Sequence, residues 1–454
     1  MQKHSQSMLR GPLLPSIISY TIPLILTGLL QLLFNAADLV VVGRFCGSVS
    51  VAAVGATGAI TNLVINLFIG FSVGAGVTVA HGLGAREEEA VHRTVHTALP
   101  TALLGGLLLT VIGVLFAEDL LIMMGTPESV LPLSALYMRI YFGGMVFNMV
   151  YNFVASILRA AGDTKSPLTF LTIAGVVNVI LNVIFVTVFH MNVAGVALAT
   201  TTAQAISAIL VTITLMRRKD ACRLYLKKMR FYKVQFLKIV RIGLPAGVQS
   251  SLFSISNVMI QSSINSFGEV VMSGNAAAGN LEGFVYVVMN AFHQTSVNFV
   301  GQNVGARQYD RVKKTLHICL GCVTVLGLTS SVLMYSFAPQ LLSIYITDSA
   351  DAIASGVTRM SVVCLTYFLC GIMETTTGAL RGMGASVTPM IISVLGVCGV
   401  RLGWIFTIFQ ISQFHTPWWL YISYPISWLA TFACQLFAFQ KLYRQRLRML
   451  RGAP

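Results

Sequence analysis

Charged residues are scarce in this chain of 454 residues, of which only 10% are Asp, Glu, Lys or Arg. Soluble domains carry roughly 25% charged residues, so a water-soluble fold of this size is excluded. The acids are fewest: 15 Asp and Glu against 30 Lys and Arg give a net charge of +15. In a soluble protein this excess would indicate nucleic-acid binding. Here the basic residues lie between long apolar segments, so we predict no nucleic-acid partner and attribute the charge to membrane topology.

Other familiar signals are missing as well. No cleavable signal peptide is evident, because MQKHSQSMLRG leads directly into a long apolar segment. The eight cysteines are dispersed without the spacing of a metal site, so we expect free thiols. No nucleophile–base pair or metal motif appears, and we therefore predict neither an enzyme nor a bound cofactor.

Long apolar runs are abundant instead, and hydrophobic residues make up 56% of the chain. A helix that crosses a bilayer needs roughly 20 apolar residues. This rule predicts an all-α integral membrane protein with about twelve transmembrane helices. The predicted spans are 15–43, 51–78, 94–117, 131–157, 167–190, 193–216, 239–266, 275–300, 315–337, 355–379, 388–411 and 419–440.

The basic residues predict the orientation of these spans. With the N-terminus in the cytoplasm, 26 of the 30 Lys and Arg residues fall on the inner side, as the positive-inside rule requires. Only Arg44, Arg139 and Arg359 then lie toward the outside, and Arg401 falls inside a span. We therefore predict a multi-pass protein of the plasma or inner membrane with both termini in the cytoplasm.

The two halves of the sequence repeat at an offset of about 222 residues. GLGAR at 82–86 matches NVGAR at 303–307, and SILRAAGDTKSP at 156–167 matches GALRGMGASVTP at 378–389. An even number of helices per unit makes the repeats parallel, as in transporters whose lobes rock around a central site. The predicted domains are an N-lobe at 1–216, a basic linker at 217–238, a C-lobe at 239–440 and a basic tail at 441–454.

Ionisable residues inside a bilayer are costly and usually functional. Three carboxylates lie in predicted spans: Asp38, Glu282 and Glu374. Asp38 lies roughly 8 Å below the outer end of its helix, at 1.5 Å per residue. Four polar residues of the first half fall at a similar depth: Tyr137, Asn178, Asn182 and Thr200. Together these oxygens suit a proton or a sodium ion, which prefers oxygen ligands; interhelical hydrogen bonding is the alternative for the neutral residues.

A second polar face begins at Glu282. Its members recur at helical spacing: Glu282, Tyr286, Met289 and His293. One acid with aromatic and thioether neighbours suits an organic cation, although packing within the lobe would also explain the apolar members. The preceding span presents Asn257 and Gln261 on one face, as a substrate cavity would require.

Two further residues complete the predicted substrate site. Glu374 lies near the inner end of its span, where it either functions or simply reaches the cytoplasmic surface. Arg401 lies in mid-span and needs a carboxylate or a water-filled cavity. By depth, Glu282 is the nearest match for Arg401.

At this point the sequence resembles the multidrug and toxic compound extrusion (MATE) transporters. The resemblance rests on IPLILTGLLQLLFNAADLVVVGR at 22–44, VAAVG at 51–55 and the repeated motifs above, and it covers nearly the whole chain. It implies a V-shaped fold of twelve helices in two lobes. It also implies export of organic cations driven by inward proton or sodium flow.

The resemblance also assigns single residues. Asp38 matches the helix-1 aspartate of the family's N-lobe ion site, and Asn178 and Thr200 match its helix-5 asparagine and helix-6 threonine. Many relatives carry an acid where this chain has Asn182, which leaves one charge fewer. Glu282 resembles the helix-8 acid of a drug-exporting bacterial branch.

The residues and the resemblance together predict a monomeric antiporter, surrounded by membrane lipids, that exports amphipathic cationic drugs or metabolites in exchange for protons or sodium ions. A flippase for lipid-linked precursors is the alternative, but such a carrier needs several basic residues in its cavity and this chain offers only Arg401. A receptor or channel is disfavoured by the twofold repeat and by the lack of a pore loop.

Overall fold

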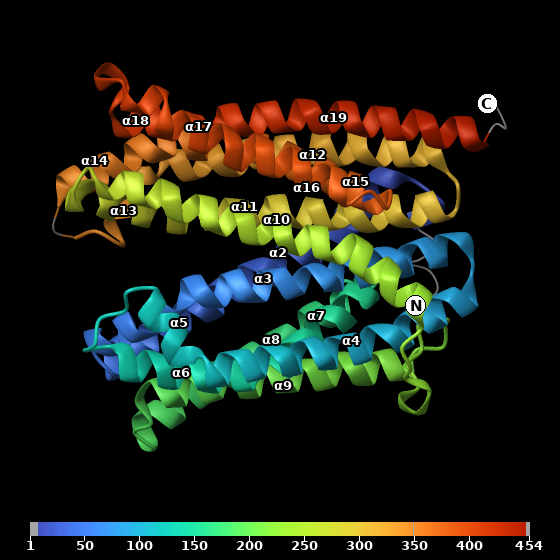
Figure 1. Cartoon of the computed structure of the whole chain (residues 1–454), viewed down its shortest axis with the longest axis horizontal. Coiled ribbons are helices and arrows are strands. Elements are labelled where there is room, and N and C mark those ends of the chain that lie inside the picture. Colours follow the sequence, from blue (N-terminus) through green and yellow to red (C-terminus); the bar gives the residue numbers. More distant parts are fainter. Residues whose placement is uncertain (1–7, 348, 451–454) are drawn as a thin grey trace. The chain divides into compact units, whose positions relative to one another are not determined.

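The structure, a computed structural model, describes residues 8–347 and 349–450. Within this part of the chain every regular element is a helix, in agreement with the predicted all-α fold (Figure 1). The helices of the first half are α2 (Leu13–Phe45), α3 (Ser48–Ala85), α4 (Glu88–Leu115), α5 (Ala117–Met123), α6 (Leu131–Gly143), α7 (Met145–Ala160), α8 (Lys165–Val183), η1 (Ile184–Val188) and α9 (Asn192–Arg217).

The second half repeats this order after the short linker helix η2 (Leu226–Lys228). Its helices are α10 (Lys233–Asn265), α11 (Glu269–Gly305), α12 (Tyr309–Ser336), α13 (Ala338–Ser343), α14 (Ala350–Arg359), η3 (Met360–Cys364), α15 (Tyr367–Gly382), α16 (Val387–Ser393), η4 (Val394–Gly399), α17 (Val400–Phe406), η5 (Ile408–Gln410), η6 (Ser412–Phe414), α18 (Pro417–Tyr421) and α19 (Ser423–Leu450).

Twelve helical segments correspond to the twelve predicted spans. Among the described residues, eight are long and apolar enough to cross a membrane as they stand, and two bent pairs raise the number to ten. The remaining two, α10 and α11, have 33 and 37 residues and carry more polar side chains. The bends were not predicted: α6 and α7 meet at 46°, and α14 with η3 meets α15 at 41°.

The internal duplication is visible in the backbone. Three pairs of positions one repeat apart have positive φ: Gly47 (88°) and Gly268 (90°), Arg86 and Arg307 (both 57°), and Gly162 (87°) and Gly384 (82°). Gly47 and Gly268 directly precede α3 and α11, whereas the other two pairs follow helix ends, where a left-handed residue stops the helix sharply. Both halves therefore begin and end their helices with the same backbone devices, which confirms the repeat.

The chain forms two compact units, which we call the N-terminal unit (Ile22–Ser251) and the C-terminal unit (Ser7–Thr21 with Leu252–Pro454). The divisions fall inside α2 and α10, whereas the lobes predicted from the sequence divide at residues 217–238. Those lobe boundaries remain a prediction.

In the N-terminal unit, α3 packs against α4 and α7, and α8 packs against α9. The first part of α10 lies against α3 through glycines spaced four apart on both helices. A Cβ atom on Gly70 would lie 2.3 Å from the Gly247 nitrogen, and one on Gly74 would lie 2.2 Å from the Ile239 carbonyl oxygen. Small residues allow membrane helices to approach this closely.

In the C-terminal unit, α11 packs against α12, α14 and α15, and α15 packs against α19. The start of α2 also belongs here. The Thr21 and Thr295 hydroxyls lie 2.8 Å apart, and the Tyr20 ring meets the Phe299 ring edge-on at 5.3 Å. These contacts attach the first turns of α2 to α11.

Candidate ion and substrate sites

Four of the five residues predicted for the ion site form one hydrogen-bond network. Asn182 Nδ2 donates to Asp38 Oδ1, and the Thr200 hydroxyl donates to Asp38 Oδ2 at 3.2 Å. Asn182 Nδ2 also donates to Asn178 Oδ1 at 2.7 Å, and Asn178 Nδ2 donates to Thr200 Oγ1 at 3.3 Å. The network joins α2, α8 and α9, so the structure brings these four residues together.

Asp38 has no counter-ion in the part of the chain that the structure describes. Among the described residues it makes no ion pair, and its partners Asn182 and Thr200 are neutral. Asn182 is fully buried, and its Oδ1 has no hydrogen-bond partner. A carboxylate beside amide and hydroxyl oxygens is a suitable place for a small hard cation.

Tyr137 lies beside this network but is not bonded into it. Its ring packs against a cluster that includes Val41 and Val42 of α2, and it stacks on Tyr141 with centroids 6.0 Å apart. No hydrogen bond joins Tyr137 to Asp38. The side chain therefore lies outside the hydrogen-bond network of Asp38.

Glu282 is not a free carboxylate, and it pairs with Arg359 rather than with Arg401, the match that depth suggested. Arg359 donates from Nε to Glu282 Oε1 at 3.0 Å and from an Nη group to Oε2 at 2.7 Å. Both side chains are buried, with 4% of Glu282 and 10% of Arg359 exposed. Arg401 was the nearest match by depth, but depth does not fix the angular position of a side chain. The bidentate geometry neutralises Glu282 within the C-terminal unit.

Arg359 anchors a longer polar chain. Its Nη1 donates to Asn275 Oδ1 at 2.6 Å, and Asn275 Nδ2 donates to Gln261 Oε1 at 3.1 Å. The guanidinium also lies 5.6 Å from the Tyr421 ring and 5.5 Å from the Tyr424 ring. Gln261 was predicted to line a cavity with Glu282, and the network links the two through Asn275 and Arg359.

Arg401 has an aromatic rather than an acidic environment. Its guanidinium lies 4.1 Å from the centre of the Tyr424 ring and 5.5 Å from that of Trp428, and its Nε donates to Ser427 Oγ at 3.0 Å. It is 4% exposed, and no carboxylate among the described residues pairs with it. Cation–π contacts stabilise such a charge only partly, which leaves Arg401 as a buried cation without a counter-ion.

Glu374 is enclosed rather than exposed at the cytoplasmic surface. His293 Nδ1 lies 2.8 Å from the Glu374 carbonyl oxygen and 3.3 Å from its Oε2, and His293 Nε2 lies 3.3 Å from Arg381 Nη1. Arg381 can only donate, so Nε2 accepts and Nδ1 carries the hydrogen. His293 is therefore a neutral bridge between Glu374 and Arg381.

The other residues of the predicted substrate face separate into exposed and packed positions. Tyr286 is 42% exposed and Asn257 is also exposed, so both are accessible. Met289 is fully buried, and a Cβ atom on Gly371 would lie 2.2 Å from its sulfur. Met289 thus fills the space between α11 and α15, so it packs within the C-terminal unit, which was the alternative to substrate binding.

Sequence reasoning missed Arg359, Asn275 and Arg381 as parts of these clusters. Arg359 lies within the predicted span 355–379, and an arginine inside a span is itself a signal. Each π-helical segment also adjoins a site residue: η1 starts two residues after Asn182, η3 directly follows Arg359, and η4 ends two residues before Arg401. Such turns are frequent at functional sites.

The fold and its buried polar clusters define a polytopic membrane transporter. The MatE family model matches residues 23–184 and again residues 245–406, so the chain belongs to the MatE family and carries its unit twice. Members of this family are transporters and not enzymes, as the sequence predicted.

Individual relatives agree with this assignment. The probable multidrug resistance protein YoeA of Bacillus subtilis is 27% identical over 94% of this chain and 93% of its own length. The FAD transporter of Shewanella oneidensis is 25% identical over 76% of this chain and 77% of its own. A crystal structure of MATE in complex with MaL6 superposes with a TM-score of 0.90, at 21% identity, over 97% of this chain and 99% of the other. The last comparison shows the two-lobe fold.

Proposed function

We propose that this chain is a secondary active antiporter that exports amphipathic small molecules in exchange for inward-moving protons or sodium ions. The observation that carries the proposal is Asp38, a membrane carboxylate whose hydrogen-bond partners are all neutral. An uncompensated charge at this depth is costly, so a bound cation stabilises the site. The direction of transport is supported by the name of the relative YoeA, a probable multidrug resistance protein.

The coupling follows from this charge. With a cation bound, Asp38 and its neighbours form a neutral group that can remain buried. Without the cation the carboxylate favours a conformation in which it is hydrated. The two states therefore differ in free energy according to ion occupancy, which is what a driving ion requires.

The coupling ion is either a proton or sodium. A proton needs only the Asp38 carboxylate. Sodium would need further oxygen ligands, and the Thr200 hydroxyl and Asn182 Oδ1 could supply them. Asn182 Oδ1 is buried and has no hydrogen-bond partner. The chain offers one carboxylate here, so we propose a coupling stoichiometry of one cation per cycle.

The test is Asp38→Asn in proteoliposomes under separate proton and sodium gradients. We expect gradient-driven efflux to disappear while yield and thermal stability stay near wild type, because asparagine retains the size of the side chain. Its oxygen can still accept from Asn182, and its amide nitrogen can donate to the Thr200 oxygen in place of the lost bond. Glu118→Gln is the matched control, since Glu118 forms an exposed pair with Arg139. Wild-type efflux in Asp38→Asn would reject the assignment.

A second variant separates the two ions. Asn182→Asp adds a carboxylate directly beside Asp38, and two acids at this distance cannot both ionise easily. We expect the pH or sodium dependence of efflux to change. If neither dependence moves, Asn182 is outside the coupling site.

For the substrate we propose an amphipathic organic cation, supported by the exposed Tyr286 on the face predicted to bind it. Glu282 would then recognise charge only if a substrate displaces Arg359. Glu282→Gln tests this: selective loss of a cationic dye, with a matched neutral dye unaffected, would support recognition. Equal loss of both dyes would assign Glu282 a structural role.

An amphipathic anion is the second candidate substrate, because Arg401 is a buried cation that no carboxylate of residues 8–347 and 349–450 pairs with. The relative named as an FAD transporter gives a precedent for a phosphate-bearing substrate in a similar chain. Counterflow of matched cationic and anionic dyes distinguishes the two classes. Arg401→Gln should abolish transport of the anion alone if Arg401 binds it.

A further inference from the structure

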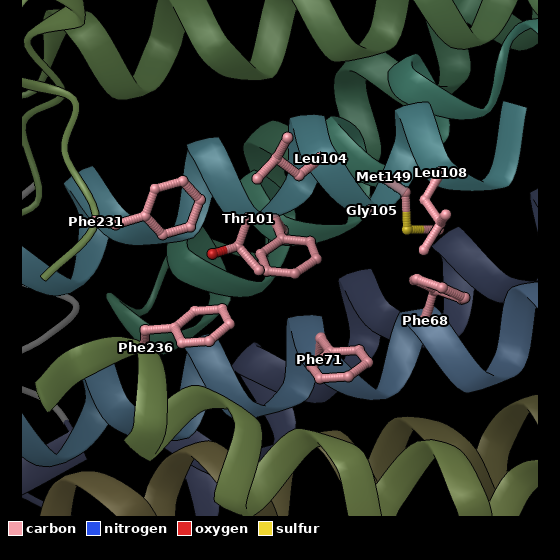
Figure 2. A pocket seen from close by; sticks show the side chains of 10 residues that line it. Phe68, Phe71, Thr101, Leu104, Gly105, Leu108, Met149, Phe231 and Phe236 are labelled. Atoms are coloured by element: carbon pink, nitrogen blue, oxygen red, sulfur yellow. The ribbon is translucent and has the colours of Figure 1, made fainter. Parts of the chain in front are cut away.

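The N-terminal unit contains an apolar cavity of about 220 Å³ (Figure 2). Its lining comes from α3, α4, α7, the linker before α10, and α10 itself, and it includes five phenylalanines. The one hydroxyl in the lining, on Thr101, donates to the Thr97 carbonyl oxygen at 2.8 Å. No polar group of the lining is therefore left to recognise a hydrophilic ligand.

The cavity opens at an apolar surface. Leu104 and Leu108 of its lining are 56% and 49% exposed on α4, a helix apolar enough to span the membrane. In a bilayer these side chains contact hydrocarbon. The cavity is therefore accessible to molecules dissolved in the membrane.

One end of the cavity is formed by the basic linker, which is fastened to the start of α4. Arg230 N–H donates to the His96 carbonyl oxygen at 3.2 Å, and Tyr232 N–H donates to Thr97 Oγ1 at 3.2 Å. These bonds fix Phe231 between them, and its ring lines the cavity (Figure 2). The basic linker therefore forms part of the apolar wall of the cavity.

Three exposed basic residues lie beside this wall. Arg230 and Lys233 flank Phe231 and Tyr232 in sequence, and Lys238 follows Phe236 by two residues. All three are exposed, and none forms an ion pair within residues 8–347 and 349–450. Clusters of basic residues next to a membrane helix attract anionic lipid head groups.

The dimensions favour a chain over a compact molecule. From Thr101 near the linker to Leu108, the lining runs seven residues along α4, or roughly 10 Å. Pockets for drug-sized ligands measure about 300–1,000 Å³, which exceeds this cavity. We propose that the cavity binds a segment of one acyl chain of an anionic membrane phospholipid, whose phosphate lies against Arg230 and Lys233. This site does not depend on which substrate the protein transports.

The test is photo-crosslinking of the full-length protein in nanodiscs. Two probes carry the same diazirine acyl chain on a phosphatidylglycerol or a phosphatidylcholine head group, and labelled peptides are mapped by mass spectrometry. We expect the phosphatidylglycerol probe to label the α4 and linker–α10 peptides at least several-fold more than the phosphatidylcholine probe. Unlabelled phosphatidylglycerol should compete for these positions.

Two variants separate the acyl-chain and head-group contacts. Gly105→Leu places a side chain in the cavity, since Gly105 is part of the lining and a Cβ atom there lies at an ordinary contact distance of 3.4 Å from Phe68. It should remove cavity labelling by both probes. Gly321→Leu is its control, because nothing lies within 4 Å of that position. The double variant Arg230→Gln/Lys233→Gln should make the two probes label equally.

Lys441→Gln/Arg444→Gln removes the same charge from the C-terminal helix and should preserve the preference for phosphatidylglycerol. Equal labelling of wild type by both probes would overturn the anionic site. Labelling of the cavity residues that is no stronger than labelling of the rest of α4 would also overturn it. The proposal would fail as well if a transported dye, but not phosphatidylglycerol, displaced the label. The last result would identify the cavity as a drug site instead.

Discussion

Breaking the Glu282–Arg359 pair from one side should strongly destabilise the C-terminal unit. Glu282→Gln keeps the shape of the side chain but leaves the Arg359 guanidinium buried with a neutral partner. The pair is bidentate, at 3.0 and 2.7 Å, and little of either side chain is exposed. Water therefore cannot replace the lost charge.

The expected cost follows from this burial. Removing one partner of a buried ion pair typically costs about 3–5 kcal/mol, because the other charge remains desolvated. Two features reduce the cost here. Asn275 still accepts from Arg359 at 2.6 Å, and the Tyr421 and Tyr424 rings lie within cation–π distance. We therefore expect about 3 kcal/mol, at the lower end of the range.

The assay is thermal unfolding of purified protein in detergent, followed by reaction of exposed thiols with a fluorogenic maleimide. The eight cysteines are free, and five of them are buried in the folded protein, so unfolding gives a signal. Glu118→Gln breaks the exposed pair with Arg139 and is the control, for which at most about 1 kcal/mol is expected. The double variant Glu282→Gln/Arg359→Gln should recover much of the loss, since no unpaired charge remains.

A small effect of Glu282→Gln, similar to that of Glu118→Gln, would refute this reasoning. It would mean that water or another carboxylate reaches Arg359 in the membrane. Failure of the double variant to improve on the single variant would show that hydrogen bonding, rather than charge, holds α11 to α14.

Three further outcomes are expected. Alkaline phosphatase fused after residue 220 should be inactive and after residue 270 active, and the reverse pattern would refute cytoplasmic termini. Gly243→Leu should destabilise the protein by about 1–3 kcal/mol through overpacking, because its Cβ would lie 2.6 Å from the Phe71 backbone, whereas Gly321→Leu should have little effect. Burial raises the pKa of the Cys222 thiol to about 12, so this thiol should resist maleimide at pH 8 until the protein unfolds. Because the folded pKa is the higher one, its contribution to stability should persist below about pH 9 and decline between pH 9 and 12.

The members of the Asp38 network could be predicted from the sequence because a bilayer orders residues by depth. A span of about 20 residues must be helical to satisfy its backbone, and the helix rise then fixes how deep each residue lies. Asp38, Asn178, Asn182 and Thr200 share one depth in neighbouring helices, and the structure joins them by hydrogen bonds. The internal repeat could also be predicted, since it is a property of the sequence.

The partners of the buried charges in the C-terminal unit could not be predicted from the depth of each residue. Depth matched Glu282 with Arg401, but Glu282 faces α14, and the π-helical turn after Arg359 helps to place that side chain. Arg401 instead lies against the aromatic rings of α19. Which residues meet depends on how each helix is rotated about its axis, and a hydropathy pattern this uniformly apolar carries little information on rotation.

The sequence by itself determined the membrane class, the number of helical segments, the duplication and the acids that must be neutralised, because each of these follows from the cost of polar groups in hydrocarbon. The tertiary structure alone decided that Arg359 neutralises Glu282, that Arg401 pairs with no acid among the described residues, and that the linker closes an apolar cavity against α4. These features arise from helix rotation, from bends at π-helical turns and from close glycine contacts, which bring together residues far apart in the chain.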